Sequence, residues 1–149
     1  MPLSNIVLVG VDGSPESGDA LNYAVAEASR RGAQLRVVSA YFPEYSARGR
    51  TEPVSASESA IEVDVEAQTR QMVDEALAGG LTKPPVDIVV AAGPAAGVLI
   101  DMSREVDVLV VGRRGRGGFA SMLLGSVGLQ CVLHAHCSVV VVRPSEVGE

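Results

Sequence analysis

Five short apolar segments alternate with amphipathic helical patterns along the chain. The segments are Asn5–Val11, Leu35–Ala40, Val86–Ala91, Val106–Val111 and Ser138–Arg143. They are rich in β-branched residues, which favour strands, and runs such as VLVV and VVVV are apolar almost continuously, as in strands covered on both faces. This order predicts an α/β fold in which a five-stranded parallel open sheet carries helices on both faces.

Four helical patterns connect these segments. Ser14 and Pro15 suit the N-cap and first position of the first helix, and Gly32 suits its end. The apolar residues of this helix recur at helical spacing, at Leu21, Ala24, Val25 and Ala28. The second pattern ends before Gly79, the third follows the third strand, and the fourth begins after Gly125-Ser126.

One stretch interrupts the alternation. Residues Phe42 to Ser59 contain prolines, serines and mixed charges, which predicts a long loop after the second strand. This loop is either a solvated connector or a lid. The chain has 149 residues, and we expect one domain over residues 1–144 and a flexible tail at 145–149.

Charge and hydropathy argue against two classes of partner. The net charge is -6, so no general basic field is expected to hold nucleic acid or acidic lipid. No apolar stretch approaches the roughly 18 residues that a bilayer span requires, and no basic leader is visible. Cys131 and Cys137 are too few for a disulfide framework. We therefore expect a cytoplasmic protein with reduced thiols, bound to neither nucleic acid nor membrane.

Glycine-rich turns follow three of the predicted strands, as VGVDGS, AAGPAAG and GRRGRGG. In a parallel sheet these turns meet beyond the carboxyl ends of the strands, where ligands bind. Glycine allows close backbone approach, and successive N–H groups form a nest for an anion. The N–H groups at the start of the fourth helix, at Gly125-Ser126, face the same place, and we expect them to hold phosphate.

The spacing of these glycines carries a family resemblance. Neither GxxxxGK[ST] nor GxGxxG is present. Instead Gly112, Gly115, Gly125 and Ser126 form G-2x-G-9x-G-[ST], which resembles the ATP-binding motif of the universal stress protein family. IVLVGVDGSPES is similar to that family's opening strand and turn, and HAHCSVVVVRP to its closing strand.

The resemblance implies strand order 3-2-1-4-5 and an adenine-nucleotide site that holds ATP with Mg²⁺ or Mn²⁺, the metal being held mainly by the phosphates. Val11 and Ala40 would contact adenine, and Val111 and Gly112 would pass close to the ribose. Asp12 would lie near the ribose and the metal-bearing phosphates. The implied phosphate contacts are Gly115, Gly125, Ser126 and Val127. The resemblance also implies a homodimer paired through Ser138 to Arg143, an outer strand that would otherwise present an unprotected edge.

Several residues have a second interpretation. Asp12, followed by Gly-Ser-Pro, also suits an ordinary turn that caps the first helix. Arg113 and Arg114 are expected to reach phosphate oxygens, but they also suit a solvated loop or, less well, an RGG-like contact to RNA. A further cluster has the residue types of a zinc site but unsuitable spacing, so packing at a helix end is expected instead: Cys131, His134, His136 and Cys137.

Two classes of function fit this sequence. No nucleophile set, paired carboxylates or phosphate-loop lysine is visible, which favours a nucleotide-binding stress or signalling module with no catalytic residues and with an unidentified regulatory partner. The alternative is a slow ATP-hydrolysing enzyme of the adenine-nucleotide α-hydrolase type. Cyclic AMP in place of ATP is a third possibility, because the sequence predicts a phosphate site without fixing the number of phosphates.

Overall fold

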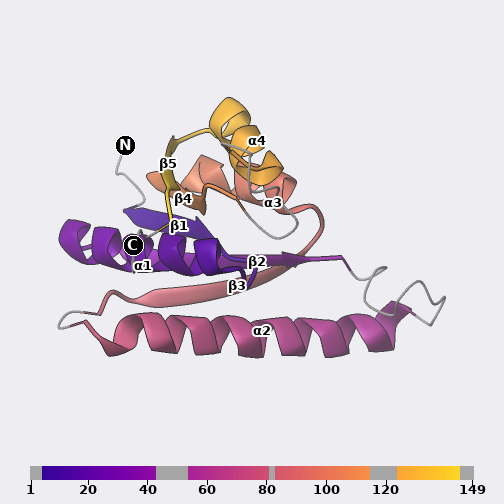
Figure 1. Cartoon of the computed structure of the whole chain (residues 1–149). Helices are drawn as coiled ribbons and strands as arrows, with labels where there is room; N and C mark the ends of the chain where they lie inside the picture. Colours follow the sequence, from indigo (N-terminus) through magenta and orange to yellow (C-terminus); the bar gives the residue numbers. More distant parts are fainter. Residues whose placement is uncertain (1–4, 43–53, 81–82, 115–123, 145–149) are drawn as a thin grey trace.

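The computed structural model describes residues 5–42, 54–80, 83–114 and 124–144. Strands and helices alternate along the chain (Figure 1). The strands are β1 (Ile6–Gly10), β2 (Gln34–Tyr41), β3 (Val86–Ala92), β4 (Val108–Gly112) and β5 (Ser138–Val142). The helices are α1 (Pro15–Arg31), α2 (Val54–Ala78), α3 (Ala95–Met102) and α4 (Ser126–His134), with a short 3₁₀ helix at Ser103–Glu105.

The strands form one parallel sheet in the order β3-β2-β1-β4-β5, which confirms the expected fold class and strand order. β1 lies at the centre and pairs with β2 on one side and β4 on the other. β3 and β5 are the two edge strands. The strand bounds differ from the expected ones by one or two residues.

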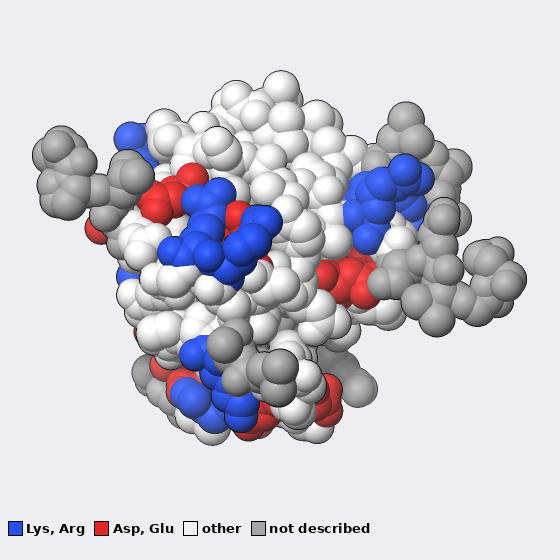
Figure 2. All heavy atoms as spheres, turned by 90° about the vertical axis from the view of Figure 1, so that its left-hand side faces the viewer, with Lys and Arg blue, Asp and Glu red and all other residues white. Residues whose placement is uncertain are grey.

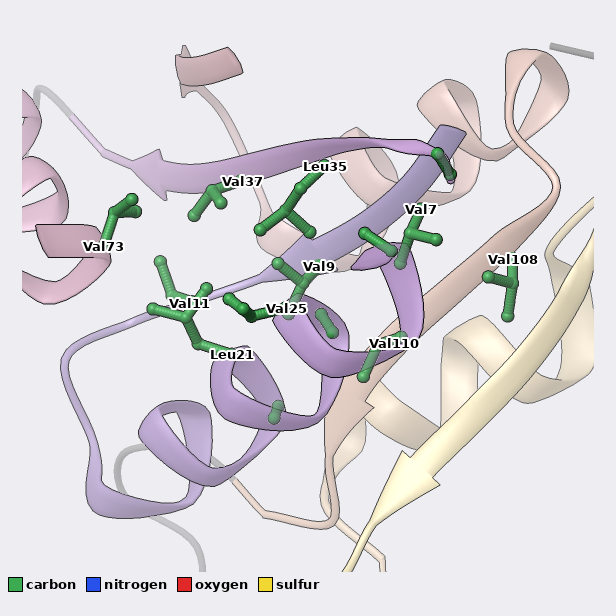
Figure 3. Close-up of a cluster of buried hydrophobic side chains, with 14 residues drawn as sticks. Val7, Val9, Val11, Leu21, Val25, Leu35, Val37, Val73, Val108 and Val110 are labelled. Atoms are coloured by element: carbon green, nitrogen blue, oxygen red, sulfur yellow. The ribbon is translucent and has the colours of Figure 1, made fainter. Parts of the chain in front are cut away.

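Helices cover both faces of the sheet. α1 and α2 lie against one face, and α3 and α4 against the other (Figure 1). Alternate residues of the central strands face the two layers, so Val7 and Val9 pack with α1 while Leu8 packs with α3 and α4. In Figure 3, side chains from β1, β2, β4 and α1 point toward one another in the first of these layers. Burial on both faces explains the continuous apolar runs.

The expected signals at the ends of α1 are confirmed. The Ser14 hydroxyl accepts a hydrogen bond from the Ser17 backbone N–H at 3.2 Å, and Pro15 is the first helical residue. Gly32 ends the helix in the left-handed conformation, at φ 63°, which suits glycine because it has no Cβ.

The expected loop at Phe42 to Ser59 is wrong in its last part. α2 begins at Val54 and runs for 25 residues, so residues 54–59 are helical. The sequence SASESA contains the helix formers alanine and glutamate, and a proline immediately precedes the helix in sequence, where proline is tolerated. The lid and connector interpretations fall on residues 43–53, and the flexible tail on residues 145–149, both of which lie outside the described residues.

The described surface carries charges of both signs. On the face shown in Figure 2, basic and acidic side chains lie beside one another in small groups, next to a broad area without charged residues. On α1, Glu27 forms ion pairs with Arg30 and Arg31. Within the described ranges, no helix is long and apolar enough to cross a membrane.

Candidate functional site

The strand order reverses between β1 and β4. The helix that follows β1 packs on one face of the sheet and the helix that follows β4 packs on the other. Val9 and Val110 form the last residue pair between β1 and β4, so the two strands separate beyond this pair. In open α/β sheets, ligands bind where such a separation occurs at the carboxyl ends of the strands. The candidate site is therefore built from the segments that follow β1 and β4.

Val11 and Asp12 follow β1. The Val11 side chain is 6% exposed and lies in the core with α1, and its backbone N–H donates to the Val38 oxygen at 2.9 Å. Val11 can therefore meet a ligand only through its remaining backbone. The exposed Asp12 accepts a hydrogen bond on Oδ1 from the Ser14 backbone N–H at 2.9 Å. The turn role of Asp12 is thus present in the structure.

Ala40 lies near the end of β2. The last residue of β2 that pairs with β1 is Val38, opposite Gly10, so Ala40 extends beyond the end of the central strand. On its other side Ala40 pairs with Ala91 of β3. This position at the carboxyl edge of the sheet is the one expected for contact with the base of a nucleotide.

Gly112, at the end of β4, lies between the first turns of two helices. A Cβ on Gly112 would be 2.9 Å from the backbone oxygen of Glu16 in α1. From the other side, the Cβ position of Gly128 in α4 lies 3.6 Å from the Gly112 oxygen. The N-termini of α1 and α4 therefore converge on Gly112, and both helix dipoles present their positive ends there. The neighbouring Val111 is buried in the core.

The chain returns to this point at the start of α4. Gly125 is the N-cap residue, and its N–H donates to the Arg113 oxygen at 2.7 Å. α4 begins at Ser126, as expected, and among the described residues no side chain caps its N-terminus. Ser126 is exposed and Val127 half-buried. The uncapped N-terminus and the Ser126 hydroxyl thus lie next to the end of β4.

Arg113 has a buried donor atom that finds no hydrogen-bond partner among the described residues. Its backbone N–H donates to the Val142 oxygen at 3.0 Å, which fixes the residue between β4 and β5. Its side-chain Nε is buried and, within the described part of the chain, makes no hydrogen bond. Because an unsatisfied buried donor is costly, this atom favours an anionic ligand. The donors at this place fit a phosphate group.

Arg114 forms an ion pair that the sequence analysis did not anticipate. Its Nε and Nη2 lie 3.0 and 2.9 Å from Oε1 of Glu16, and its backbone N–H donates to Oε2 of the same carboxylate at 2.7 Å. The contact joins residues 98 positions apart in the sequence. Only the proximity of α1 to the end of β4 in the folded sheet indicates this pairing, so neither residue's local sequence predicts it.

The structure brings most of the predicted site residues to one edge of the sheet. Those following β1 and β4 and those opening α4 lie together, while Ala40 lies on the other side of β1. Gly115, a predicted phosphate contact, lies outside the described residues.

The cysteine and histidine cluster lies at the end of α4. Burial raises the pKa of the Cys131 thiol to about 11, and burial also raises the pKa of Cys137. The His136 backbone N–H donates to the Ser103 hydroxyl at 2.9 Å, which ties the chain after α4 to the 3₁₀ helix. Across the residues that the structure describes, no three His, Cys, Asp or Glu side chains are grouped to hold a metal ion.

Comparison with known proteins identifies the same fold. Solved structures similar to this chain include a universal stress protein from Lactobacillus plantarum, at TM-score 0.78 and 22% identity, covering 96% of this chain and 100% of that one. Another is a universal stress protein in complex with cAMP, at TM-score 0.68 and 25% identity, covering 97% and 100% of the two chains. A third is an Arabidopsis thaliana family protein with AMP bound, at TM-score 0.60 and 18% identity, covering 97% and 94%.

Sequence relatives agree. Universal stress protein Rv2624c of Mycobacterium tuberculosis is 34% identical over 142 residues, which are 95% of this chain and 49% of that protein. Universal stress protein Rv2005c of the same organism is 40% identical over an alignment of 143 residues that covers 93% of this chain and 45% of that protein. The chain thus spans about half the length of these curated relatives. Residues 4–143 match the model of the universal stress protein family. The chain belongs to the universal stress protein family.

Proposed function

We propose that this chain binds an adenine nucleotide and acts as a stress-response or signalling module through its nucleotide-bound state. The observation that carries the proposal is the buried Arg113 Nε, which makes no hydrogen bond to any described residue and lies in the residue that ties the end of β4 to Gly125. An anion at this place would accept from that donor and from the uncapped N-terminus of α4.

The proposed ligand is ATP with Mg²⁺ or Mn²⁺. The phosphates would lie against the glycines of the motif and the start of α4, with Gly112, Gly115, Gly125, Ser126 and Val127 as contacts. The backbones of Val11 and Ala40 would meet the adenine, and Val111 and Gly112 would pass close to the ribose. The exposed Asp12 would lie near the metal, which the phosphates would mainly hold.

Cyclic AMP is a second candidate ligand. The solved universal stress protein in complex with cAMP is 25% identical to this chain, and the Arabidopsis protein carries AMP. Both ligands share the adenine, the ribose and one phosphate. A single phosphate would satisfy Arg113 and the start of α4, so the number of phosphates is decided by binding measurements on this chain.

The proposed role is binding rather than rapid turnover. The hydrogen-bond donors near Gly112 are Arg113, Arg114 and the start of α4, and the Glu16 carboxylate accepts from Arg114. These donors suit the holding of an anion. The first two carboxylates after β1, those of Asp12 and Glu16, accept hydrogen bonds from Ser14 and Arg114. Turnover far below the enzyme median of about 10 per second is expected. Hydrolysis near that rate, lost in Asp12→Ala, would instead favour the α-hydrolase-type enzyme.

The wider setting of the chain is also proposed. We expect a domain over residues 1–144, a location in the cytoplasm, a homodimer paired through Ser138 to Arg143, and a regulatory protein partner whose identity is open. The mixed charges on the face shown in Figure 2 support a partner other than nucleic acid.

Calorimetric titration of the purified protein tests the binding proposal directly. ATP, AMP and cAMP are each titrated with and without Mg²⁺, after mass spectrometry of any nucleotide that the protein retains. Arg113→Gln should weaken binding by at least about tenfold, because a charge-assisted hydrogen bond contributes roughly 1.5–3 kcal/mol.

The matched control for this titration is Arg36→Gln. Arg36 lies on β2 and contacts Asp87 at 3.3 Å, so its loss should leave nucleotide affinity unchanged. Absence of binding of all three nucleotides to the folded wild-type protein would refute the proposed function. Equal affinity of the wild type and Arg113→Gln would remove Arg113 from the site.

A further inference from the structure

The Glu16 carboxylate occupies a set of donors that suits an anion. It accepts the Arg114 backbone N–H at 2.7 Å on one oxygen, and the Arg114 Nε and Nη2 at 3.0 and 2.9 Å on the other. A backbone N–H combined with a guanidinium fork is the arrangement by which proteins hold carboxylates and phosphates. Here the anion that fills it comes from the protein itself.

This carboxylate is fixed at the centre of the candidate site. Glu16 is the second residue of α1, and its backbone oxygen lies 2.9 Å from the Cβ position of Gly112. The Glu16 and Arg114 side chains are 14% and 19% exposed, so solvent screens the pair only in part. Helix packing therefore holds a negative charge beside the end of β4.

The Glu16–Arg114 ion pair leaves the neighbouring Arg113 and Arg114 side chains with different charge balance. Arg114 is balanced by Glu16, whereas Arg113 has a buried Nε that makes no hydrogen bond within the described residues. At the start of α4, next to Arg113, a first phosphate would meet unbalanced donors. Each additional phosphate would meet an arginine already neutralised and a carboxylate of its own sign, which repels it.

We propose that Glu16 is a specificity-determining residue that occupies the second anion position of the site and disfavours long phosphate chains relative to a single phosphate. This inference rests on the proposed nucleotide binding, and it assigns Glu16 a role in choosing among adenine nucleotides. The carboxylate acts as an internal competitor for Arg114. Neutralising it weakens the hold of residue 16 on the Arg114 donors and removes the repulsion together.

The experiment compares ATP with AMP in the wild type and in Glu16→Gln, because Gln keeps the size of Glu and one acceptor oxygen but replaces the other oxygen with an NH2 donor and removes the charge. Calorimetric titration without Mg²⁺ should give an ATP affinity on the order of tenfold higher in Glu16→Gln, as expected for one partly screened charge contact, and a smaller gain for AMP. Mg²⁺ neutralises part of the phosphate charge, so the gain for ATP should shrink when Mg²⁺ is added.

Glu27→Gln is the matched control. Glu27 lies on the same helix and also forms ion pairs with arginines, Arg30 and Arg31, near the opposite end of α1. The same substitution there should leave the ratio of ATP to AMP affinity unchanged. A change of that ratio in Glu27→Gln equal to that in Glu16→Gln would reduce the effect to net charge and overturn the proposal.

Arg114→Gln tests the mechanism independently, including the case in which Glu16→Gln does not fold. It leaves the Glu16 carboxylate without its partner, so ATP affinity should fall more than AMP affinity. In the double variant Glu16→Gln/Arg114→Gln the ATP affinity should recover above that of Arg114→Gln, by less than the gain in the wild-type background. Equal losses for ATP and AMP in Arg114→Gln would indicate a purely structural pair and overturn the proposal.

The failure of this inference is distinguishable from failure of the proposed function. If wild type and variants bind both nucleotides with an unchanged ratio, the nucleotide site stands and the role of Glu16 is refuted. Weaker ATP binding in folded Glu16→Gln would likewise refute it, since the carboxylate would then organise the site. If folded wild type and Glu16→Gln bind neither nucleotide, both the proposed function and this inference are refuted.

Discussion

The backbone oxygen of Glu16 lies 2.9 Å from the place where Gly112 would carry a Cβ. This contact gives Gly112 a structural reason to be glycine in addition to the expected approach of a ribose. Real Cβ atoms essentially never lie so close to a backbone oxygen, so a side chain at this position would displace the first turn of α1. The packing of α1 on β4 and the geometry of the candidate site therefore depend on the same residue.

Gly112→Ala should destabilise the protein by about 1–3 kcal/mol, because the added methyl group meets backbone rather than a movable side chain. Urea unfolding followed by circular dichroism gives the difference. Gly18→Ala, in α1, is the control, since a Cβ there meets nothing within 4 Å. Alanine at position 18 should stabilise by up to about 1 kcal/mol. A Gly112→Ala protein as stable as the wild type would contradict the packing argument.

The buried hydroxyl groups of Ser39 on β2 and Thr69 on α2 are hydrogen-bonded to each other, and that of Thr69 is also bonded to a backbone oxygen. Thr69 Oγ1 donates to the Val65 oxygen at 2.7 Å, so Ser39 Oγ must donate to Thr69 across 2.8 Å. Thr69→Val leaves the Ser39 hydroxyl buried without an acceptor and should cost about 1–3 kcal/mol. Ser39→Ala leaves Thr69 bound to Val65 and should cost less. The free energies of unfolding of the two variants test this prediction. A larger loss in Ser39→Ala than in Thr69→Val would contradict the donor assignment.

Cys131 should make stability fall at high pH. Burial raises the pKa of its thiol from 9.0 to about 11 in the folded protein. The folded state therefore holds the thiol proton more tightly than the unfolded state does. The resulting contribution to the free energy of unfolding is complete below pH 9.0, the ordinary thiol pKa, and is lost as the pH rises through about 11. Urea midpoints of the wild type and Cys131→Ala, compared at about pH 8 and about pH 10.5, should differ less at the higher pH. A constant difference would argue against this shift.

Much of the fold follows from local sequence. Short local patterns predict the five strands and the ends of α1. For α1 these are Ser14, Pro15 and Gly32, whose effects act within one turn of helix. Strands covered on both faces require apolar runs, so the sequence predicts a strand at Val106–Val111 without any knowledge of its partners, and the structure has β4 at Val108–Gly112. The start of α2 was missed because Pro53 and the serines that follow suit both a loop and a helix N-terminus.

The candidate site was predictable only where its residues carry motif spacing. Gly112, Gly125 and Ser126 were found because their spacing matches a family motif, and the structure gathers them. The pairing of Glu16 with Arg114 could not be predicted, since it joins residues 98 positions apart and depends on how α1 crosses the end of β4. The buried state of Arg113 Nε is also a property of tertiary packing.

The last prediction concerns the outer edge of β5. The Arg113 N–H donates to the Val142 oxygen, so the backbone groups of Val142, and of Val140 two residues before it, face β4. The backbone groups of Val139 and Val141 therefore face outward, along the edge through which a homodimer is proposed. Antiparallel pairing with a second copy would satisfy these groups in a two-fold interface.

Proline at position 141 should separate the two copies and preserve the fold. Val141→Pro removes an outward N–H, which an edge strand tolerates, whereas Val140→Pro removes one that faces β4 and should destabilise the sheet itself. Sedimentation at micromolar concentration should show a dimer for the wild type and a monomer for Val141→Pro, whose circular dichroism stays unchanged. A monomeric wild type would refute the proposed dimer. A dimer that persists in folded Val141→Pro would place the interface elsewhere, because an intact ladder through β5 requires that outward N–H.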